Sequence, residues 1–145
     1  MTSKMIRVLS LFSGCGGMDL GLEGGFSVHR DCINQKMNPD FIKLQSTRFR
    51  IVFANDILKE ARTAWTRHFA KYGYSAEVYR QESVVDLVKR HRAGEKVFPE
   101  KVDVVTGGFP CQDFSLAGKR GVSMSAHHLV AGILGSYHSY GTSLP

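Results

Sequence analysis

A short apolar run at residues 6–12 (IRVLSLF) leads directly into the glycine-rich residues 13–17 (SGCGG). A continuous apolar run of this length is typical of a strand that is buried on both faces of a parallel sheet. Residues 18–23 then predict a short helix that ends at Gly24 and Gly25. A strand, a glycine loop and a helix in this order place a ligand at the carboxyl end of the sheet, with an ordinary tight turn as the alternative.

Strands and helices alternate along the chain as far as residue 106. The expected strands are residues 49–55, 76–79 and 102–106, and the expected helices are residues 57–72 and 83–91. The longer helix has one apolar stripe with spacings of three and four, made of Ile57, Ala61, Ala64, Trp65, His68, Phe69 and Tyr72. Asn55 or Asp56 would cap this helix, and Ser83 with Asp86 would form a capping box for the next one. The alternation predicts an α/β fold with a doubly wound, mainly parallel sheet.

Two segments depart from this alternation. Residues 27–48 are polar, contain Pro39 and have no clean period, so we expect an inserted loop with at most one helical turn. Residues 122–145 contain no Lys, Arg, Asp or Glu, although 22% of the whole chain is charged. We therefore divide the chain into part of one folded domain at residues 1–121 and an uncharged tail at residues 122–145, which is either disordered or, as we favour, foreign to the domain.

The composition narrows the class of protein. A chain of 145 residues that is 43% hydrophobic can build one core but not two. No apolar run reaches about 18 residues and no signal peptide begins the chain, so we expect a cytoplasmic protein without a membrane span. Lys and Arg number 19 against 13 acids, and the net charge of +6 suits a polyanionic partner such as nucleic acid. Three cysteines without a C-x-x-C pair predict free thiols rather than disulfides or a zinc site.

The glycine loop does not match the pattern that binds dinucleotides. Gly14 and Gly16 occupy the first two glycine positions of that pattern, but Asp19 occupies the third. An acid there would repel phosphate, which disfavours a nicotinamide dehydrogenase. The loop therefore suits a ligand without phosphates, such as S-adenosylmethionine, whose cationic amino group Asp19 could face.

Three other acids are candidates for contacts with such a ligand. Asp56 ends the second strand, where an acid can accept both ribose hydroxyls, or simply cap a helix. It follows Gly17 by 39 residues, about twice the usual 20 or so, and the inserted loop would account for the difference. Asp31 is a weaker candidate for the ribose. Glu82 could bind the adenine amino group, or it could be a solvated acid at the start of a helix.

A second constrained loop, residues 107–112 (GGFPCQ), follows the last predicted strand. Its glycines permit tight backbone geometry and Pro110 fixes the approach of the chain, so we expect Cys111 to be held at the carboxyl end of the sheet. A thiol there becomes a nucleophile once it is ionised. The alternative is a buried structural cysteine, which is the role that we expect for Cys15 and Cys32.

At these residues the sequence resembles the C5-cytosine DNA methyltransferases. Residues 11–17 (LFSGCGG) resemble the first motif of that family, and residues 54–56 (AND) resemble the second, where the family usually has Glu. Glu82 stands where the third motif usually has Asp. Residues 107–119 (GGFPCQDFSLAGK) closely resemble the fourth, catalytic motif. The first and fourth motifs together are highly specific, and the resemblance extends over about residues 5–120.

The resemblance implies the Rossmann-like fold of S-adenosylmethionine-dependent methyltransferases, with residues 1–121 as the N-terminal part of the catalytic domain and the sheet incomplete. It implies double-stranded DNA with a flipped cytosine as the partner, in a restriction-modification system. Cys111 would be the nucleophile, in a loop shaped by Phe109, Pro110 and Gln112. The residues expected to bind the cofactor are Phe12, Gly14, Cys15, Gly16, Gly17, Asp56, Ile57, Glu82 and Ser83.

The sequence also departs from the family pattern after Arg120. The family continues with an Arg-rich segment, a Glu-Asn-Val motif, a DNA-reading domain and a final helix, and none of these occurs here. The chain therefore looks truncated, and we expect it to be inactive alone. Two alternatives stay open: a split methyltransferase whose missing motifs are on a second chain, and a non-catalytic protein that binds S-adenosylmethionine.

Overall fold

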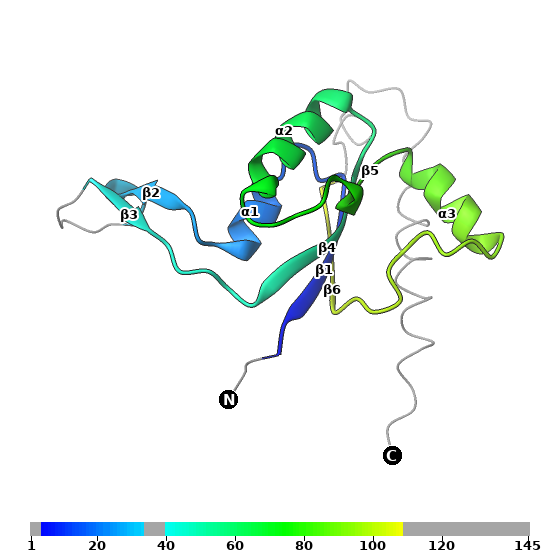
Figure 1. The fold of residues 1–145 in the computed structure, drawn as a ribbon, viewed down its shortest axis with the longest axis horizontal. Coiled ribbons are helices and arrows are strands. Elements are labelled where there is room, and N and C mark those ends of the chain that lie inside the picture. Colours follow the sequence, from blue (N-terminus) through cyan, green and yellow to red (C-terminus); the bar gives the residue numbers. More distant parts are fainter. Residues whose placement is uncertain (1–3, 34–39, 109–145) are drawn as a thin grey trace, which may run out of the picture.

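The computed structural model describes residues 4–33 and 40–108. Its centre is a sheet of four parallel strands in the order β5-β4-β1-β6 (Figure 1). The strands are β1 (Ile6–Leu11), β4 (Phe49–Asp56), β5 (Tyr79–Gln81) and β6 (Val104–Gly107). The three helices are α1 (Gly17–Glu23), α2 (Lys59–Ala70) and α3 (Val84–Arg92). The α/β fold and its parallel sheet are therefore confirmed.

The sheet has a hydrophobic cluster on each face. The α2 cluster consists of Val8, Ile51, Ala54, Trp65, Phe69, Tyr74 and Tyr79, with Leu20 and Leu22 of α1 packed against it. The α3 cluster consists of Leu9, Leu11, Phe53, Val84, Leu87, Val88 and Phe98. Neighbouring residues of β1 alternate between the two clusters because successive side chains of a strand point to opposite faces. Helices thus cover both faces, as a doubly wound sheet requires.

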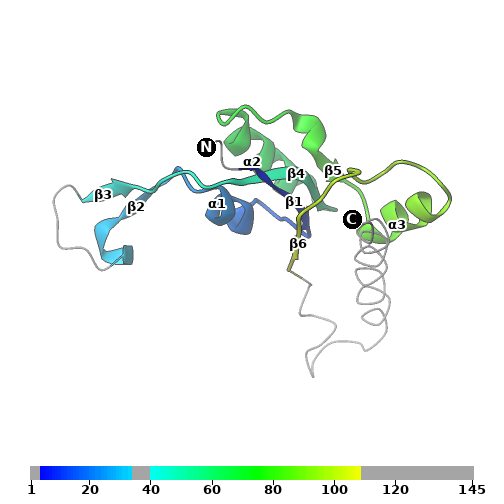
Figure 2. The same ribbon diagram turned by 90° about the horizontal axis from the view of Figure 1, so that it is seen from below.

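The segment at residues 27–48 is not the plain loop that its polar sequence predicted. Strands β2 (Ser27–His29) and β3 (Phe41–Lys43) pair antiparallel, and a short 3-10 turn, Arg30–Ile33, follows β2. This hairpin projects away from the sheet in both views (Figures 1 and 2). The predicted single helical turn corresponds to residues 30–33, but the two strands were missed.

The longer helix begins later than its apolar stripe predicted. Strand β4 continues through Asp56, the N-cap of α2 is Leu58, and the Asp56 carboxylate accepts a hydrogen bond from the Leu58 N–H at 3.1 Å. Ile57 is 65% exposed and does not belong to the buried stripe. Neither Asn55 nor Asp56 is therefore the N-cap residue, because the helix begins at Lys59 and both residues still belong to β4.

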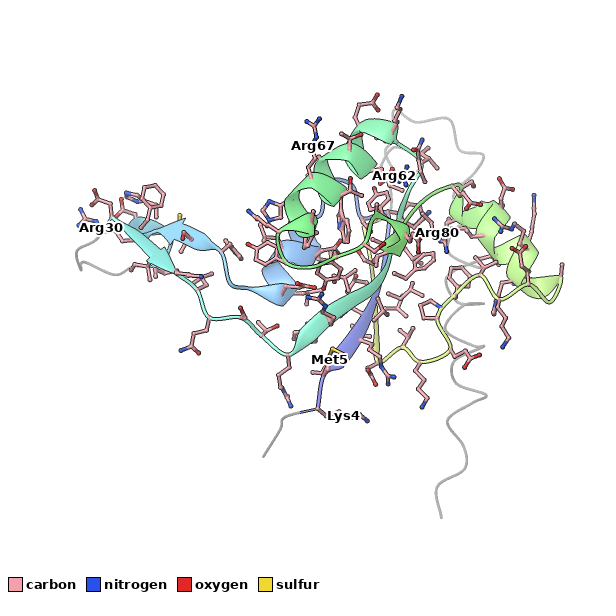
Figure 3. The ribbon with its side chains drawn as sticks, in the orientation of Figure 1. Lys4, Met5, Arg30, Arg62, Arg67 and Arg80 are labelled. Carbon is pink, nitrogen blue, oxygen red and sulfur yellow. The ribbon has the colours of Figure 1, made fainter. Side chains whose placement is uncertain are left out.

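The stripe itself is narrower than predicted. Ala61, Trp65 and Phe69 are buried, whereas Ala64 is exposed. The opposite side of α2 carries Arg67, which extends away from the sheet (Figure 3). This division of the helix into a buried aromatic side and a basic outer side is that of an ordinary amphipathic surface helix.

Three other boundaries moved by one to three residues. Residues 76–78 form a 3-10 turn, and β5 follows it instead of occupying residues 76–79. The hydroxyl of Ser83 caps α3 by accepting from the Val85 N–H at 3.2 Å, as predicted, but the Asp86 carboxylate lies beside Lys89 rather than completing a capping box. Strand β6 begins at Val104.

In the described residues no helix is long and apolar enough to span a membrane.

Candidate functional site

The glycine loop lies at the carboxyl end of β1, in the middle of the sheet. Phe12, Gly14 and Gly16 all have positive φ angles, of 53°, 53° and 90°. Gly16 also has no room for a side chain, since a Cβ atom there would lie 2.6 Å from Trp65 and 2.7 Å from Phe69. The loop is therefore seated directly on the aromatic side chains of α2, and glycine at position 16 is required by both space and backbone conformation.

Two side chains from neighbouring strands hold Gly14. The Asp56 carboxylate at the end of β4 accepts a hydrogen bond from the Gly14 N–H at 3.0 Å. The Tyr79 hydroxyl at the start of β5 donates to the Gly14 carbonyl at 3.0 Å. Burial, together with the nearby acids Asp56 and Asp19, raises the pKa of Tyr79, which keeps its hydroxyl protonated as a donor. The Asp56 carboxylate and the Tyr79 hydroxyl thus hold the glycine loop from the side of β4 and β5.

Asn55 links three strand ends, a role that its sequence position did not reveal. Its backbone carbonyl accepts from the Ser13 N–H at 2.8 Å, and its N–H donates to the Ser13 hydroxyl at 3.1 Å. Its side-chain amide donates to the carbonyls of Arg80 at 3.0 Å and Glu82 at 2.7 Å. The amide is buried, so the carboxyl ends of β1, β4 and β5 are locked together. A polar amide at the end of an otherwise apolar strand was the available signal.

Asp19 does not face the loop's ligand side, which corrects the sequence prediction. The residue is fully buried, and its carboxylate accepts hydrogen bonds from the Ser10 hydroxyl at 2.6 Å and from the Trp65 indole N–H at 2.7 Å. Burial raises the pKa of Asp19, although these two hydrogen bonds lower it in part. The carboxylate lies beneath the loop and has no exposed surface, so Asp19 is not available to an amino group above it.

Glu82 and Ser83 lie where β5 leads into α3. The Glu82 carboxylate pairs with the guanidinium of Arg90, which also pairs with Glu95. Ser83 uses its hydroxyl to cap α3. Both residues therefore make structural contacts at the edge of the site, while the Glu82 side chain keeps 38% of its surface exposed and stays accessible to a ligand.

The two cysteines of the described residues, Cys15 and Cys32, are exposed and unpaired. The expectation that they are buried structural residues is therefore wrong. Cys15 lies in the glycine loop, and Cys32 follows β2 in the hairpin. Asp31, the weaker candidate for a ribose, is in the hairpin too, where it lies beside His29 and Arg30 and not beside the glycine loop. In the part of the chain that the structure describes, no cluster of His, Cys, Asp and Glu could hold a metal ion.

Strand β6 brings the start of the Pro-Cys segment to the glycine loop. Gly107, its last residue, is the pairing partner of Leu11, the last residue of β1. A Cβ atom on Gly107 would lie 3.6 Å from the Leu11 Cβ and 3.8 Å from the Phe12 ring. Phe109, Pro110, Cys111 and Gln112 lie outside the described residues. Two segments almost one hundred residues apart in sequence thus leave the sheet side by side.

Comparison with known proteins settles the family. Residues 6–134 match the model of the C-5 cytosine-specific DNA methylases. The chain belongs to this family. Its similarity to curated family members extends over most of its length, but it spans only about a quarter of the length of those methylases.

Three of these relatives are methyltransferases from bacteria and an archaeon. M.BsuRI of Bacillus subtilis, a type II methyltransferase, is 36% identical over 121 residues, which are 79% of this chain and 25% of the relative. M.ApeKI of Aeropyrum pernix, a DNA (cytosine-5-)-methyltransferase, is 33% identical over 138 residues, which are 85% and 24%. M.BspRI of Lysinibacillus sphaericus, another type II methyltransferase, is 32% identical over 125 residues, which are 81% and 26%.

Proposed function

We propose that this chain supplies the cofactor-binding and nucleophile-bearing part of a DNA (cytosine-5)-methyltransferase of a restriction-modification system. The observation that carries the proposal is the pairing of Leu11 with Gly107, which starts the glycine loop and the Pro-Cys segment at neighbouring points of one sheet edge. A methyl donor and a nucleophile must act on the same base, so their binding segments must be neighbours. The family match over residues 6–134 supports the same assignment.

The residues at this edge suit S-adenosylmethionine, which supplies a methyl group when bound. Asp56 already accepts from the N–H groups of Gly14 and Leu58. A carboxylate offers about four acceptor positions, so Asp56 can also accept from the two ribose hydroxyls. Ile57, which is 65% exposed next to Asp56, would provide apolar contact to the adenine ring. Glu82 and Ser83 would line the far side of the adenine ring, and residues 12 and 14–17 would surround the rest of the cofactor.

Cys111 would provide the covalent step. Its thiolate adds to carbon 6 of a cytosine that has been flipped out of the duplex, which makes carbon 5 electron-rich. Carbon 5 would then take the methyl group as its bond to the donor sulfur breaks, with S-adenosylhomocysteine as the leaving group. A base would remove the carbon-5 proton, and the electron pair of that C–H bond would restore the ring double bond as the thiolate leaves. Phe109, Pro110 and Gln112 would shape the loop that presents the sulfur.

The first test is cofactor binding by the 145-residue chain. We expect isothermal titration to detect S-adenosylmethionine and the product S-adenosylhomocysteine, with an affinity that falls about tenfold in Asp56→Asn, the loss associated with charge-assisted hydrogen bonds. Arg48→Gln, an exposed residue at the opposite end of β4, is a matched control and should bind normally. Tight binding of NADH and none of either methionine derivative would exclude the proposal.

The second test is covalent trapping on DNA that contains 5-fluorocytosine, because fluorine at carbon 5 cannot leave as a proton does. Residues 1–145 contain no Glu-Asn-Val motif, whose glutamate holds the cytosine N3 proton in the family, so we expect methylation only when the later motifs are supplied, in this experiment as a second chain added to the mixture. An adduct that forms in that mixture and disappears in Cys111→Ala is the expected result. Cofactor binding without any adduct would favour a non-catalytic binding protein.

A further inference from the structure

Asp19 is an ionisable residue that the proposed reaction does not use. It is fully buried, and within residues 4–33 and 40–108 no lysine, arginine or histidine forms an ion pair with it. A buried carboxylate without a cation lowers stability unless hydrogen bonds compensate for its lost hydration. Asp19 has two such bonds, both from donors: the Ser10 hydroxyl and the Trp65 indole. These two hydrogen bonds favour the ionised form of Asp19, whereas its burial favours the neutral acid.

A series of hydrogen bonds links Asp19 to the carboxyl ends of β1 and β4, where the cofactor site is proposed. The Asn55 N–H donates to the Ser13 hydroxyl at 3.1 Å, and that hydroxyl lies within donating distance of Ser10, 2.9 Å from its hydroxyl and 3.0 Å from its carbonyl. The Ser10 hydroxyl donates to Asp19 at 2.6 Å. The series reaches the carboxylate without a break when the Ser13 hydroxyl gives its single proton to the Ser10 hydroxyl rather than to the Ser10 carbonyl, and a series that ends on an anion strengthens every bond within it.

These hydrogen bonds connect the buried Asp19 carboxylate to the proposed methyl-donor site. Ser13 begins the glycine loop, and Asn55 directly precedes Asp56, the proposed ribose acid. Trp65, on the other side of Asp19, fills the space beneath Gly16. We propose that the ionised carboxylate of Asp19 positions the glycine loop and the end of β4 for the methyl donor, without touching the donor itself. This inference rests on the proposed function.

The charge state of Asp19 then affects binding and stability in opposite directions. The titratable groups that interact with it are Glu23 on α1 and Tyr79 on β5, and Tyr79 in turn lies near Asp56 and Cys15; none of these groups supplies a positive charge. Since the folded-state pKa is raised, protonation of Asp19 as the pH falls stabilises the folded chain relative to its ionised form. The same protonation adds a donor where two donors already converge, so it disrupts the series and weakens donor binding.

Asp19→Asn tests the inference, because asparagine has the same shape and no charge. We expect S-adenosylhomocysteine to bind this variant about tenfold more weakly than the wild-type chain at pH 7.5, while the urea midpoint stays equal or rises. Glu23→Gln is the matched control. Burial raises the pKa of Glu23 as well, but its carboxylate accepts from the Ile51 N–H at the other end of α1, so the affinity should stay within about twofold of wild type.

The wild-type chain provides a second readout that needs no substitution. Trp65 is the chain's single tryptophan, and its indole bonds directly to Asp19, so its emission should report the protonation of that carboxylate. We expect the emission and the S-adenosylhomocysteine affinity to change together as the pH falls, in wild type and in Glu23→Gln but not in Asp19→Asn. Wild-type affinity in Asp19→Asn, or equal losses of affinity and stability, would overturn the inference alone. Absence of binding by the wild-type chain would overturn the proposed function and the inference together.

Discussion

The two faces of the sheet are built differently. The α2 cluster contains Trp65, Tyr74 and Tyr79, whose polar atoms all make hydrogen bonds within the protein. The α3 cluster contains only aliphatic and phenylalanine side chains, and its charged groups, Arg90 with Glu82 and Glu95, lie outside it at the surface. The cores are similar in the number of large side chains but not in their chemistry.

The difference shows where packing also organises the site. On the α2 face the Tyr79 hydroxyl holds the Gly14 carbonyl, and Trp65 holds Asp19, so each aromatic residue both fills the core and directs the glycine loop. On the α3 face no buried side chain of the cluster has a polar atom to offer. Substitutions on the α2 face should therefore reduce stability and cofactor affinity together, whereas those on the α3 face should reduce stability alone.

The largest expected effect comes from truncating one large side chain on each face. Trp65→Ala removes a fully buried ring and leaves one of the two Asp19 carboxylate oxygens without its donor, so we expect a loss of about 4 kcal/mol in the free energy of unfolding. Leu87→Ala, also fully buried, should cost about 3 kcal/mol. At a temperature where both variants are folded by circular dichroism, only Trp65→Ala should bind S-adenosylhomocysteine poorly. Equal affinities would remove the distinction between the faces.

A smaller change isolates one hydroxyl on the α2 face. Tyr79→Phe removes the donor to the Gly14 carbonyl and should cost about 1 kcal/mol of stability and several-fold in cofactor affinity, measured by urea unfolding and titration calorimetry. Tyr74→Phe is the matched control. It removes a hydroxyl that accepts from the Ile51 N–H, but the Glu23 carboxylate accepts from that same group, so neither quantity should change much.

The smallest effect lies at the amino end of the sheet, outside both clusters. Hydrogen bonds from Arg7 lower the pKa of Asp103 to about 2. A lowered folded-state pKa means that the ion pair stabilises the fold above the ordinary aspartate pKa of about 3.9 and loses this effect as the pH falls toward 2. Asp103→Asn should therefore be slightly less stable than wild type at pH 7, with the difference shrinking as the pH falls from about 4 toward 2 and with unchanged cofactor affinity at pH 7. A difference as large at pH 2 as at pH 7 would contradict this assignment.

The sequence predicted the sheet well because its signals were local. The apolar runs that became β1 and β4, and the serine that caps α3, were each recognisable within a few residues. The hairpin was missed since its strands have only three residues each and little apolar character. The start of α2 was misplaced because Ile57 fits the helical period, although it is exposed beyond the end of β4.

The position of the candidate residues in the fold was predicted better than the contacts between them. Gly14, Asp56 and Glu82 do lie at one edge of the sheet, as their positions after predicted strands implied. The roles of Asn55 and Asp19 depend on partners in other elements, Ser13 and Glu82 for one and Trp65 for the other, so a polar residue at a strand end could mark Asn55 but no local pattern could reveal these partners. Long-range hydrogen bonds of this kind follow from the topology and not from spacing.

The hairpin at residues 27–43 explains why the glycine loop and Asp56 are so far apart in sequence. The chain leaves α1 and returns to β4 at one place, where Gly24 pairs with Ser46 and the Thr47 N–H donates to the Glu23 carbonyl at 2.8 Å. The number of residues between these two contacts can therefore change without moving α1 or β4. We therefore expect that this hairpin can be lengthened, shortened or replaced without moving the two motifs. A sequence search that fixes the interval between the motifs will overlook proteins in which the hairpin has a different length.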